Sequence, residues 1–311
     1  MMVEVLTMYR HILVPLDGSE LAEQVVPYAR LLGKGLKATV DLLRVTEPVP
    51  ENVGDILRGK YPHEISAGLQ SQAKKYLEGL ASPLTRAGLR TSQAVQEGSA
   101  ADLIVSQAER QPDTLIAMST HGRSGITRWV MGSVTDKVLH ATSNPLLIIR
   151  PRDGLAPGAE ARIENIIAPV DGSDIAEQAL PHVTAMAKAL GAKVTLVRVV
   201  PTTGYYLGMM DYPSAAYEEL LQAEEDTATE YLDQVSARLK NEGVSVAGTR
   251  VGRGDAAGAI LDLAQATVNS LVVMTTHGRS GVGRWVLGSV ADRVVRNSGG
   301  PVLVVRPSAA G

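Results

Sequence analysis

The chain has 311 residues, a net charge of −3 at pH 7 and no cysteine. This length fits two domains of about 150 residues each. The small net charge argues against a protein that binds polyanions through bulk charge, and the lack of cysteine excludes disulfides, thiolate nucleophiles and cysteine-ligated metals.

Short apolar runs and amphipathic stretches alternate along the chain, and the whole series occurs twice. The first apolar run of each series ends in Asp-Gly-Ser, which predicts a buried strand leading into a helix capped by Ser19 or Ser173. These helices are expected to end near Gly33 and Gly191. The predicted strands are 11–17, 38–45, 92–96, 114–118 and 146–150, and then 166–171, 192–200, 245–251, 270–274 and 302–306. The other predicted helices include 69–86, 100–109, 220–240 and 256–266.

This alternation predicts an α/β fold. Each repeat has five strands separated by helices, and such an order is typical of a parallel sheet with right-handed crossovers and helices on both faces. The strands are apolar throughout rather than alternating, which indicates burial on both faces. The expected domains are 1–151 and 163–311, joined by an aperiodic linker at 152–162.

The most similar stretches of the two repeats are 119–136 and 275–292, which share 13 of 18 residues. Both contain Thr-His-Gly-Arg-Ser-Gly, and both end in Gly-Ser-Val before a predicted helix. A helix that begins with small residues exposes backbone N–H groups to an anion, and glycine lets the backbone approach a phosphate. The sequence therefore predicts a phosphate-binding turn at Gly132-Ser133 and at Gly288-Ser289.

Each part of this constellation has a purely structural alternative. The stretches 133–136 and 289–292 resemble capping boxes, which need no ligand. Asp17 and Asp171 are expected at the carboxyl edge of the sheet, where they could accept hydrogen bonds from ribose hydroxyls or hold a metal that bridges phosphates. The alternative for both aspartates is an Asx turn that starts the helix.

Other residues in and near the repeated loops carry weaker predictions. His121 and His277 lack an acidic sequence neighbour, which argues against catalysis. Trp129 and Trp285 are expected to pack the loop against its helix rather than to stack on a base. Phosphate contacts and a solvated loop charge are equal alternatives for four arginines, Arg123, Arg128, Arg279 and Arg284. Four tyrosines of an irregular segment, Tyr205, Tyr206, Tyr212 and Tyr217, predict either a lid or protein contact, or packing on the domain's own core.

With these motifs in place, nearly the whole chain resembles the universal stress protein family in its tandem form, which implies two flavodoxin-like (Rossmann-like) domains. ATP-binding members carry Gly-x2-Gly-x9-Gly followed by Ser or Thr. The second and third glycines match in both repeats, whereas Ser119 and Thr275 replace the first glycine, so that a Cβ is expected to crowd the phosphates. The nucleotide contacts that the resemblance implies are Pro15, Asp17, Val45, Met118, Ser119, Gly122, Gly132, Ser133 and Val134, and then Pro169, Asp171, Val199, Met274, Thr275, Gly278, Gly288, Ser289 and Val290.

The resemblance implies a regulatory stress-response protein that binds ATP, with Mg²⁺ near Asp17 and Asp171, in one or both domains. A slow ATP-hydrolysing or adenylyl-transferring enzyme and a nucleotide-free scaffold are the alternatives, and no dedicated catalytic residues stand out. The family commonly pairs through its last strand, which implies an internal pseudo-dimer and leaves room for a homodimer. No secretory signal or membrane-length apolar run is seen, so a cytoplasmic protein is expected, without nucleic-acid or membrane partners.

Overall fold

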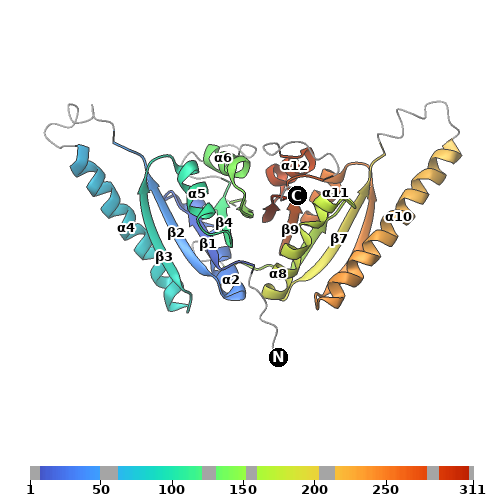
Figure 1. The fold of residues 1–311 in the computed structure, drawn as a ribbon, viewed down its shortest axis with the longest axis horizontal. Coiled ribbons are helices and arrows are strands. Elements are labelled where there is room, and N and C mark those ends of the chain that lie inside the picture. Colours follow the sequence, from blue (N-terminus) through green and yellow to red (C-terminus); the bar gives the residue numbers. More distant parts are fainter. Residues whose placement is uncertain are drawn as a thin grey trace. The chain divides into compact units, whose positions relative to one another are not determined.

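The computed structural model describes residues 8–49, 62–120, 131–151, 160–202, 214–278 and 287–307. The chain forms two compact units, Met1–Ala161 and Arg162–Gly311, called unit 1 and unit 2 below. Each unit is a five-stranded parallel sheet with helices on both faces (Figure 1). The predicted α/β fold class is therefore confirmed.

The elements follow one another in the same order in both units. Unit 1 contains β1 (His11–Pro15), α1 (Glu20–Glu23), α2 (Val26–Leu36), β2 (Thr39–Thr46), α4 (Pro62–Arg86), β3 (Thr91–Glu97), α5 (Ala100–Glu109), β4 (Thr114–Ser119), α6 (Ser133–Ala141) and β5 (Leu146–Ile149). Unit 2 contains β6 (Asn165–Pro169), α7 (Asp174–Glu177), α8 (Leu180–Leu190), β7 (Lys193–Val200), α10 (Ser214–Asn241), β8 (Val246–Arg253), α11 (Ala256–Ala266), β9 (Ser270–Thr275), α12 (Ser289–Asn297) and β10 (Val302–Val305).

The strand order is β3-β2-β1-β4-β5 in unit 1 and β8-β7-β6-β9-β10 in unit 2. In unit 1, His11 is aligned with Thr39 of β2 and with Thr114 of β4, so the first strand lies between the second and the fourth. Unit 2 repeats this register, with Asn165 aligned with Lys193 and Ser270. The chain thus extends the sheet on one side of the first strand and then crosses to the other side.

This order decides which helices share a face. Right-handed crossovers place α2 and α4 on one face of the first sheet and α5 and α6 on the other, and α5 indeed packs against α6. The fourth strands, β4 and β9, are buried at every residue because they are covered on both faces. The edge strands β3 and β8 are only partly buried, and α4 and α10 run along them (Figure 1).

The first helix of unit 1 begins after Ser19 as predicted, but it differs from its prediction in the middle and at its end. It is divided into α1 and α2, because Pro27 stands at the beginning of α2, where its ring would clash with a continuous helix. It also passes Gly33 and ends at Leu36, with Lys37 in the left-handed region at φ 56°. A Cβ on Gly33 would lie 2.5 Å from Leu89 Cδ2, so this glycine serves close packing rather than helix termination.

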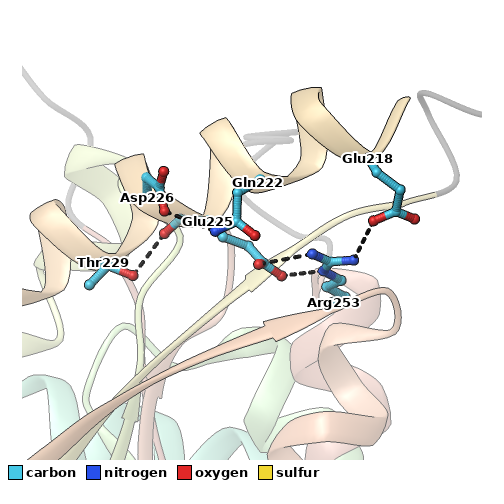
Figure 2. A network of polar contacts seen from close by, with 6 residues as sticks. All are labelled: Glu218, Gln222, Glu225, Asp226, Thr229 and Arg253. Carbon is cyan, nitrogen blue, oxygen red and sulfur yellow. Dashed lines mark hydrogen bonds and ion pairs between the residues drawn. The ribbon is translucent and has the colours of Figure 1, made fainter. Parts of the chain in front are cut away.

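The long helix of each unit is tied to the edge strand by a polar contact near the carboxyl end of that strand. In unit 2, Arg253 of β8 pairs with Glu225 and with Glu218 of α10, the latter at 3.1 Å (Figure 2). In unit 1, Ser66 of α4 donates a hydrogen bond to Glu97 of β3. These contacts are exposed, so they orient the helix end more than they stabilise the fold.

Candidate functional site

The strand order locates the candidate site at the carboxyl edge of each sheet. In an open parallel sheet, ligands bind where the chain reverses the direction in which strands are added. Here that point lies between β1 and β4 in unit 1 and between β6 and β9 in unit 2. Asp17 and Asp171 directly follow the first strands, and Ser119 and Thr275 end the fourth strands, so these predicted site residues lie at the predicted edge.

The aspartates form the turns that start the first helices. Asp17 Oδ1 accepts hydrogen bonds from Ser19 N at 3.0 Å and from Ser19 Oγ at 2.6 Å, and Asp171 Oδ1 accepts from Ser173 at the same distances. Ser19 Oγ in turn accepts from Ala22 N at 3.2 Å and caps α1. The predicted caps are confirmed, and the Asx turn that stood as the alternative is present. The serine two residues further on thus engages Oδ1 of each aspartate.

Gly278 brings the loop after β9 against the aspartate turn after β6. A Cβ built on Gly278 would lie 2.2 Å from Asp171 Oδ2, a distance that no side chain tolerates. The absence of a side chain therefore lets the backbone reach the carboxylate. Two residues predicted for the nucleotide site, more than a hundred positions apart, are thus in contact. Their counterpart loop glycine in unit 1, Gly122, lies outside the described residues.

Gly132 and Gly288 hold the turns that precede α6 and α12. Gly132 N donates to Thr120 O at 2.7 Å, and Gly288 N donates to Thr276 O at 2.8 Å. A Cβ on Gly288 would lie 2.9 Å from Thr276 O, so this turn also requires a small residue. The loop that begins at the end of the fourth strand therefore closes on its own first residues.

The capping-box interpretation of this turn is wrong. Gly132 and Gly288 are the N-cap residues, and Ser133 and Ser289 are the first helical residues, with exposed side chains. The side chain that a capping box requires at the N-cap is thus missing, and no side-chain hydrogen bond from a described residue caps either helix. The first-turn N–H groups have no intrahelical partner, and together with the helix dipole they favour an anion at this position.

The residues that replace the first glycine of the family pattern are buried. Ser119 and Thr275 are 6% and 5% exposed. Thr275 Oγ1 donates to His277 O at 2.5 Å, so its hydroxyl shapes the loop after β9. In unit 1, Thr135 Oγ1 of α6 donates to Ser119 O at 2.8 Å, a contact that unit 2 lacks because Ala291 stands at the position of Thr135.

The apolar predicted contacts lie near the strand ends and in the first turns of α6 and α12. Met118 and Met274, next to the ends of the fourth strands, are buried at 5% and 6% exposed. Val134, in the first turn of α6, is 37% exposed. The remaining predicted contacts are partly buried and lie at or near the same strand ends or in the first turn of α12, namely Pro15, Val45, Pro169, Val199 and Val290.

His277 is the one histidine of the repeated loops that the described residues include. Its Nδ1 lies 3.0 Å from Thr276 Oγ1. Burial, and after it the charge of Arg306, lowers the pKa of His277, which keeps the ring neutral at pH 7. This contact to a hydroxyl gives no support to a catalytic role.

Several predicted residues lie outside the described part of the chain, so their predictions remain open. They are His121, Arg123, Arg128, Trp129, Arg279, Arg284, Trp285, Tyr205, Tyr206 and Tyr212. Tyr217 is described, and its hydroxyl donates to Thr202 O at 3.2 Å while its ring packs against a buried cluster that includes Val200 and Leu221. For Tyr217, packing on the domain's own core is therefore the correct alternative.

A pair of buried arginines, Arg44 and Arg198, was missed by the sequence reasoning. Each is 8% exposed and lies near the carboxyl end of the second strand of its unit. The signal was present, because the runs Leu-Leu-Arg-Val and Leu-Val-Arg-Val place an arginine at the same point of two otherwise apolar strands. A charge in a buried strand needs partners, and this requirement marks both residues.

Comparison with known proteins bears on both units. The sequence model of the universal stress protein family matches residues 8–150 and 162–306. A universal stress protein of Mycolicibacterium smegmatis is 25% identical over 303 residues, covering 95% of this chain and 97% of its own. Universal stress protein MJ0531 of Methanocaldococcus jannaschii is 32% identical over 143 residues, which is 46% of this chain and 82% of the relative.

The fold has solved counterparts of similar length. The crystal structure of a universal stress protein from Archaeoglobus fulgidus matches with a TM-score of 0.68 and 21% identity, over 96% of this chain and 99% of that one. A putative universal stress protein from Pseudomonas aeruginosa matches with a TM-score of 0.67 and 18% identity, over 97% and 94%. These likenesses show the shared fold. Within the described residues, no helix is both long and apolar enough to cross a membrane.

Proposed function

The chain belongs to the universal stress protein family and carries two of its domains in tandem, and from this premise we propose that it binds ATP at one or both carboxyl-edge sites and acts as a regulatory protein of the stress response. The observation that carries the proposal is the duplicated Gly-Ser turn. Each Gly-Ser turn begins a helix whose N-cap makes no side-chain hydrogen bond. In unit 2, a Cβ on Gly278 or on Gly288 would collide with the surrounding atoms.

The residues of each site fit the parts of an adenine nucleotide. The N–H groups at the beginning of α6 and α12, together with the hydroxyls of Ser133 and Ser289, offer donors to phosphate oxygens. Asp17 and Asp171 offer carboxylate oxygens to ribose hydroxyls or to Mg²⁺ bound by the phosphates. The partly apolar strand ends offer a surface for the adenine ring.

The regulatory role follows from what such a site can do. ATP differs from ADP and AMP in the number of its phosphates, so a site that contacts the phosphates can distinguish the three nucleotides. The chain's own residues bind those phosphates where the fourth strand and the following helix meet, because Gly132 N and Gly288 N are hydrogen-bonded to the carbonyls of Thr120 and Thr276. Nucleotide binding at this position therefore alters the exposed surface of the unit that binds it, and this change is the proposed regulatory signal.

Calorimetry tests the proposal. ATP with Mg²⁺ should bind the wild-type chain with a stoichiometry of one or two, and Gly132→Val combined with Gly288→Val should abolish the binding. A Cβ on Gly288 would lie 2.9 Å from Thr276 O, and Gly132 forms the equivalent turn of unit 1. Gly299→Val is a control, since nothing lies within 4 Å of its Cβ position. Absence of binding heat with the wild-type chain at millimolar ATP, at two temperatures, would remove the proposal.

A further inference from the structure

The buried arginine of each unit lies directly against the aspartate turn. In unit 1, Arg44 Nη1 donates to Leu16 O at 3.0 Å, and Leu16 immediately precedes Asp17. In unit 2, the guanidinium of Arg198 packs against the turn backbone, because a Cβ on Gly172 would lie 3.1 Å from Arg198 Nη1. The two units thus show one arrangement, in which an arginine from the second strand holds the turn that follows the first strand.

The arginine is itself held by a tyrosine of the long helix. In unit 2 the guanidinium carbon of Arg198 lies 5.0 Å from the ring centre of Tyr231, within the range of a cation–π contact. Tyr231 is fixed in turn, because its hydroxyl donates to Glu177 Oε1 at 2.9 Å, and Arg238 Nη2 donates to Glu177 Oε2 at 2.8 Å. This chain of contacts connects α10, through Arg198, to the aspartate turn.

Unit 1 has the corresponding residues in Tyr76, Glu23 and Arg44. Burial and then Glu23 raise the pKa of Tyr76, while Arg44 opposes the rise. In unit 2, burial and then Glu177 raise the pKa of Tyr231, with Arg198 again among the opposing charges. A tyrosine, a glutamate and an arginine therefore interact beside both candidate sites.

We propose that Arg44 and Arg198 are positioning residues for nucleotide binding, and that they act by holding the Asp17 and Asp171 turns in the geometry that receives the ribose. This role rests on the proposed nucleotide function. Arginine suits it because a planar guanidinium can donate to a carbonyl at its edge while a ring covers its face. The Asp171 turn needs to be held in place, because Asp171 Oδ2 lies close against Gly278, where a Cβ would be only 2.2 Å away.

The alternative is that the arginine only stabilises the fold, as any buried and partnered charge does. The two roles differ in how they depend on the ribose hydroxyls. A residue that acts through the aspartate affects only ligands that the aspartate binds. A general loss of stability in the unit weakens the binding of every nucleotide equally.

A double-mutant cycle in unit 2 separates the two roles. The full-length chain carries Gly132→Val, so that calorimetry reads the second site alone. Arg198→Met and Asp171→Ala are each expected to weaken ATP binding about tenfold, and the double variant should be no weaker than the weaker single variant. Binding of 2′,3′-dideoxy-ATP, which lacks both ribose hydroxyls, should be unchanged by Arg198→Met.

Two further variants guard against loss of the fold. Tyr231→Phe keeps the ring beneath the guanidinium and removes only the hydroxyl bond to Glu177, so its ATP affinity should fall less than that of Arg198→Met. If the Arg198→Met variant unfolds below the assay temperature, Arg198→Lys is used in its place. Arg198→Lys should lose less ATP affinity, and its effect should likewise not add to that of Asp171→Ala.

Multiplying losses in the double variant, or equal weakening of ATP and dideoxy-ATP, would overturn the positioning role and leave ATP binding intact. If the second site binds no ATP before Arg198 is changed, the nucleotide function of unit 2 fails and the positioning role fails with it.

Discussion

Gly278 shows at the scale of a single residue why the repeated loop contains glycine. Its position beside Asp171 Oδ2 leaves no room for a Cβ, and no left-handed backbone angle is involved. The requirement is therefore spatial. The sequence indicates that this glycine matters through its repetition, but a single sequence does not identify the atom that it avoids.

Replacing Gly278 by alanine should disturb the site more than the fold. The added methyl group must displace the Asp171 carboxylate, which is short and fixed by Ser173. We expect ATP binding at the second site to weaken at least about tenfold, measured by calorimetry in the Gly132→Val chain. Gly248→Ala is the matched control, because nothing lies within 4 Å of that Cβ position and its affinity should not change. Equal affinities of the two variants would contradict this account of Gly278.

At the scale of elements, the sequence predicts which helices and strands exist better than it predicts where they begin. The helices α5 and α11 match their predicted bounds. The long helices begin earlier than predicted, at Pro62 and Ser214 instead of near 69 and 220. Much of the first part of α4 is exposed, including Leu69 at 40%, so it carries no apolar period for sequence analysis to detect.

The helix α8 carries a partly buried histidine, His182, that should make the stability of the chain depend on pH. Burial lowers the pKa of His182 from 6.5 to about 4. As the pH falls through 6.5, His182 becomes protonated in the unfolded chain but stays neutral in the folded chain. The free energy of unfolding therefore decreases between pH 6.5 and pH 4, and below pH 4 it falls no further on account of this group. Between pH 7 and pH 5 this costs about 2 kcal/mol.

Urea unfolding at pH 7 and pH 5 measures this effect. His182→Tyr is the natural comparison, because Tyr28 occupies the same position of the repeat in unit 1. Other titrating groups act alike in both proteins, so the variant should lose less stability than the wild type on acidification, by about 2 kcal/mol. The same loss in both proteins would show that His182 is as easily protonated in the fold as in the unfolded chain.

At the scale of the whole molecule, duplication made the candidate site predictable from one sequence. It separated the repeated glycines, aspartates and Gly-Ser turns from ordinary loop residues. It did not reveal Arg44 and Arg198, because an apolar run with one arginine reads as a strand and the partners of that arginine lie on other elements. Contacts such as Arg198 over Tyr231 depend on how a strand and a distant helix are packed, which residue spacing does not give.

Two sites in one chain should be separable by single substitutions. Gly132→Val alone is expected to remove binding by unit 1, and Gly288→Val alone to remove binding by unit 2, since each unit holds its own aspartate turn, glycine turn and helix beginning. If wild-type calorimetry gives two ATP per chain, each single variant should give one. Loss of all binding in either single variant would show that the two sites do not act independently.

One hydroxyl that contacts the end of the fourth strand is present in only one of the two units, and this difference has a consequence for how this protein can change. Thr135 holds the carbonyl of Ser119 in one unit, whereas in the other Ala291 replaces that threonine and Thr275 holds His277. In an assembly of two identical one-domain chains, every substitution enters both sites at once and must suit both. Within a single chain the two halves are encoded separately, so substitutions can change the ligand or the affinity of one half while the other half keeps its original function.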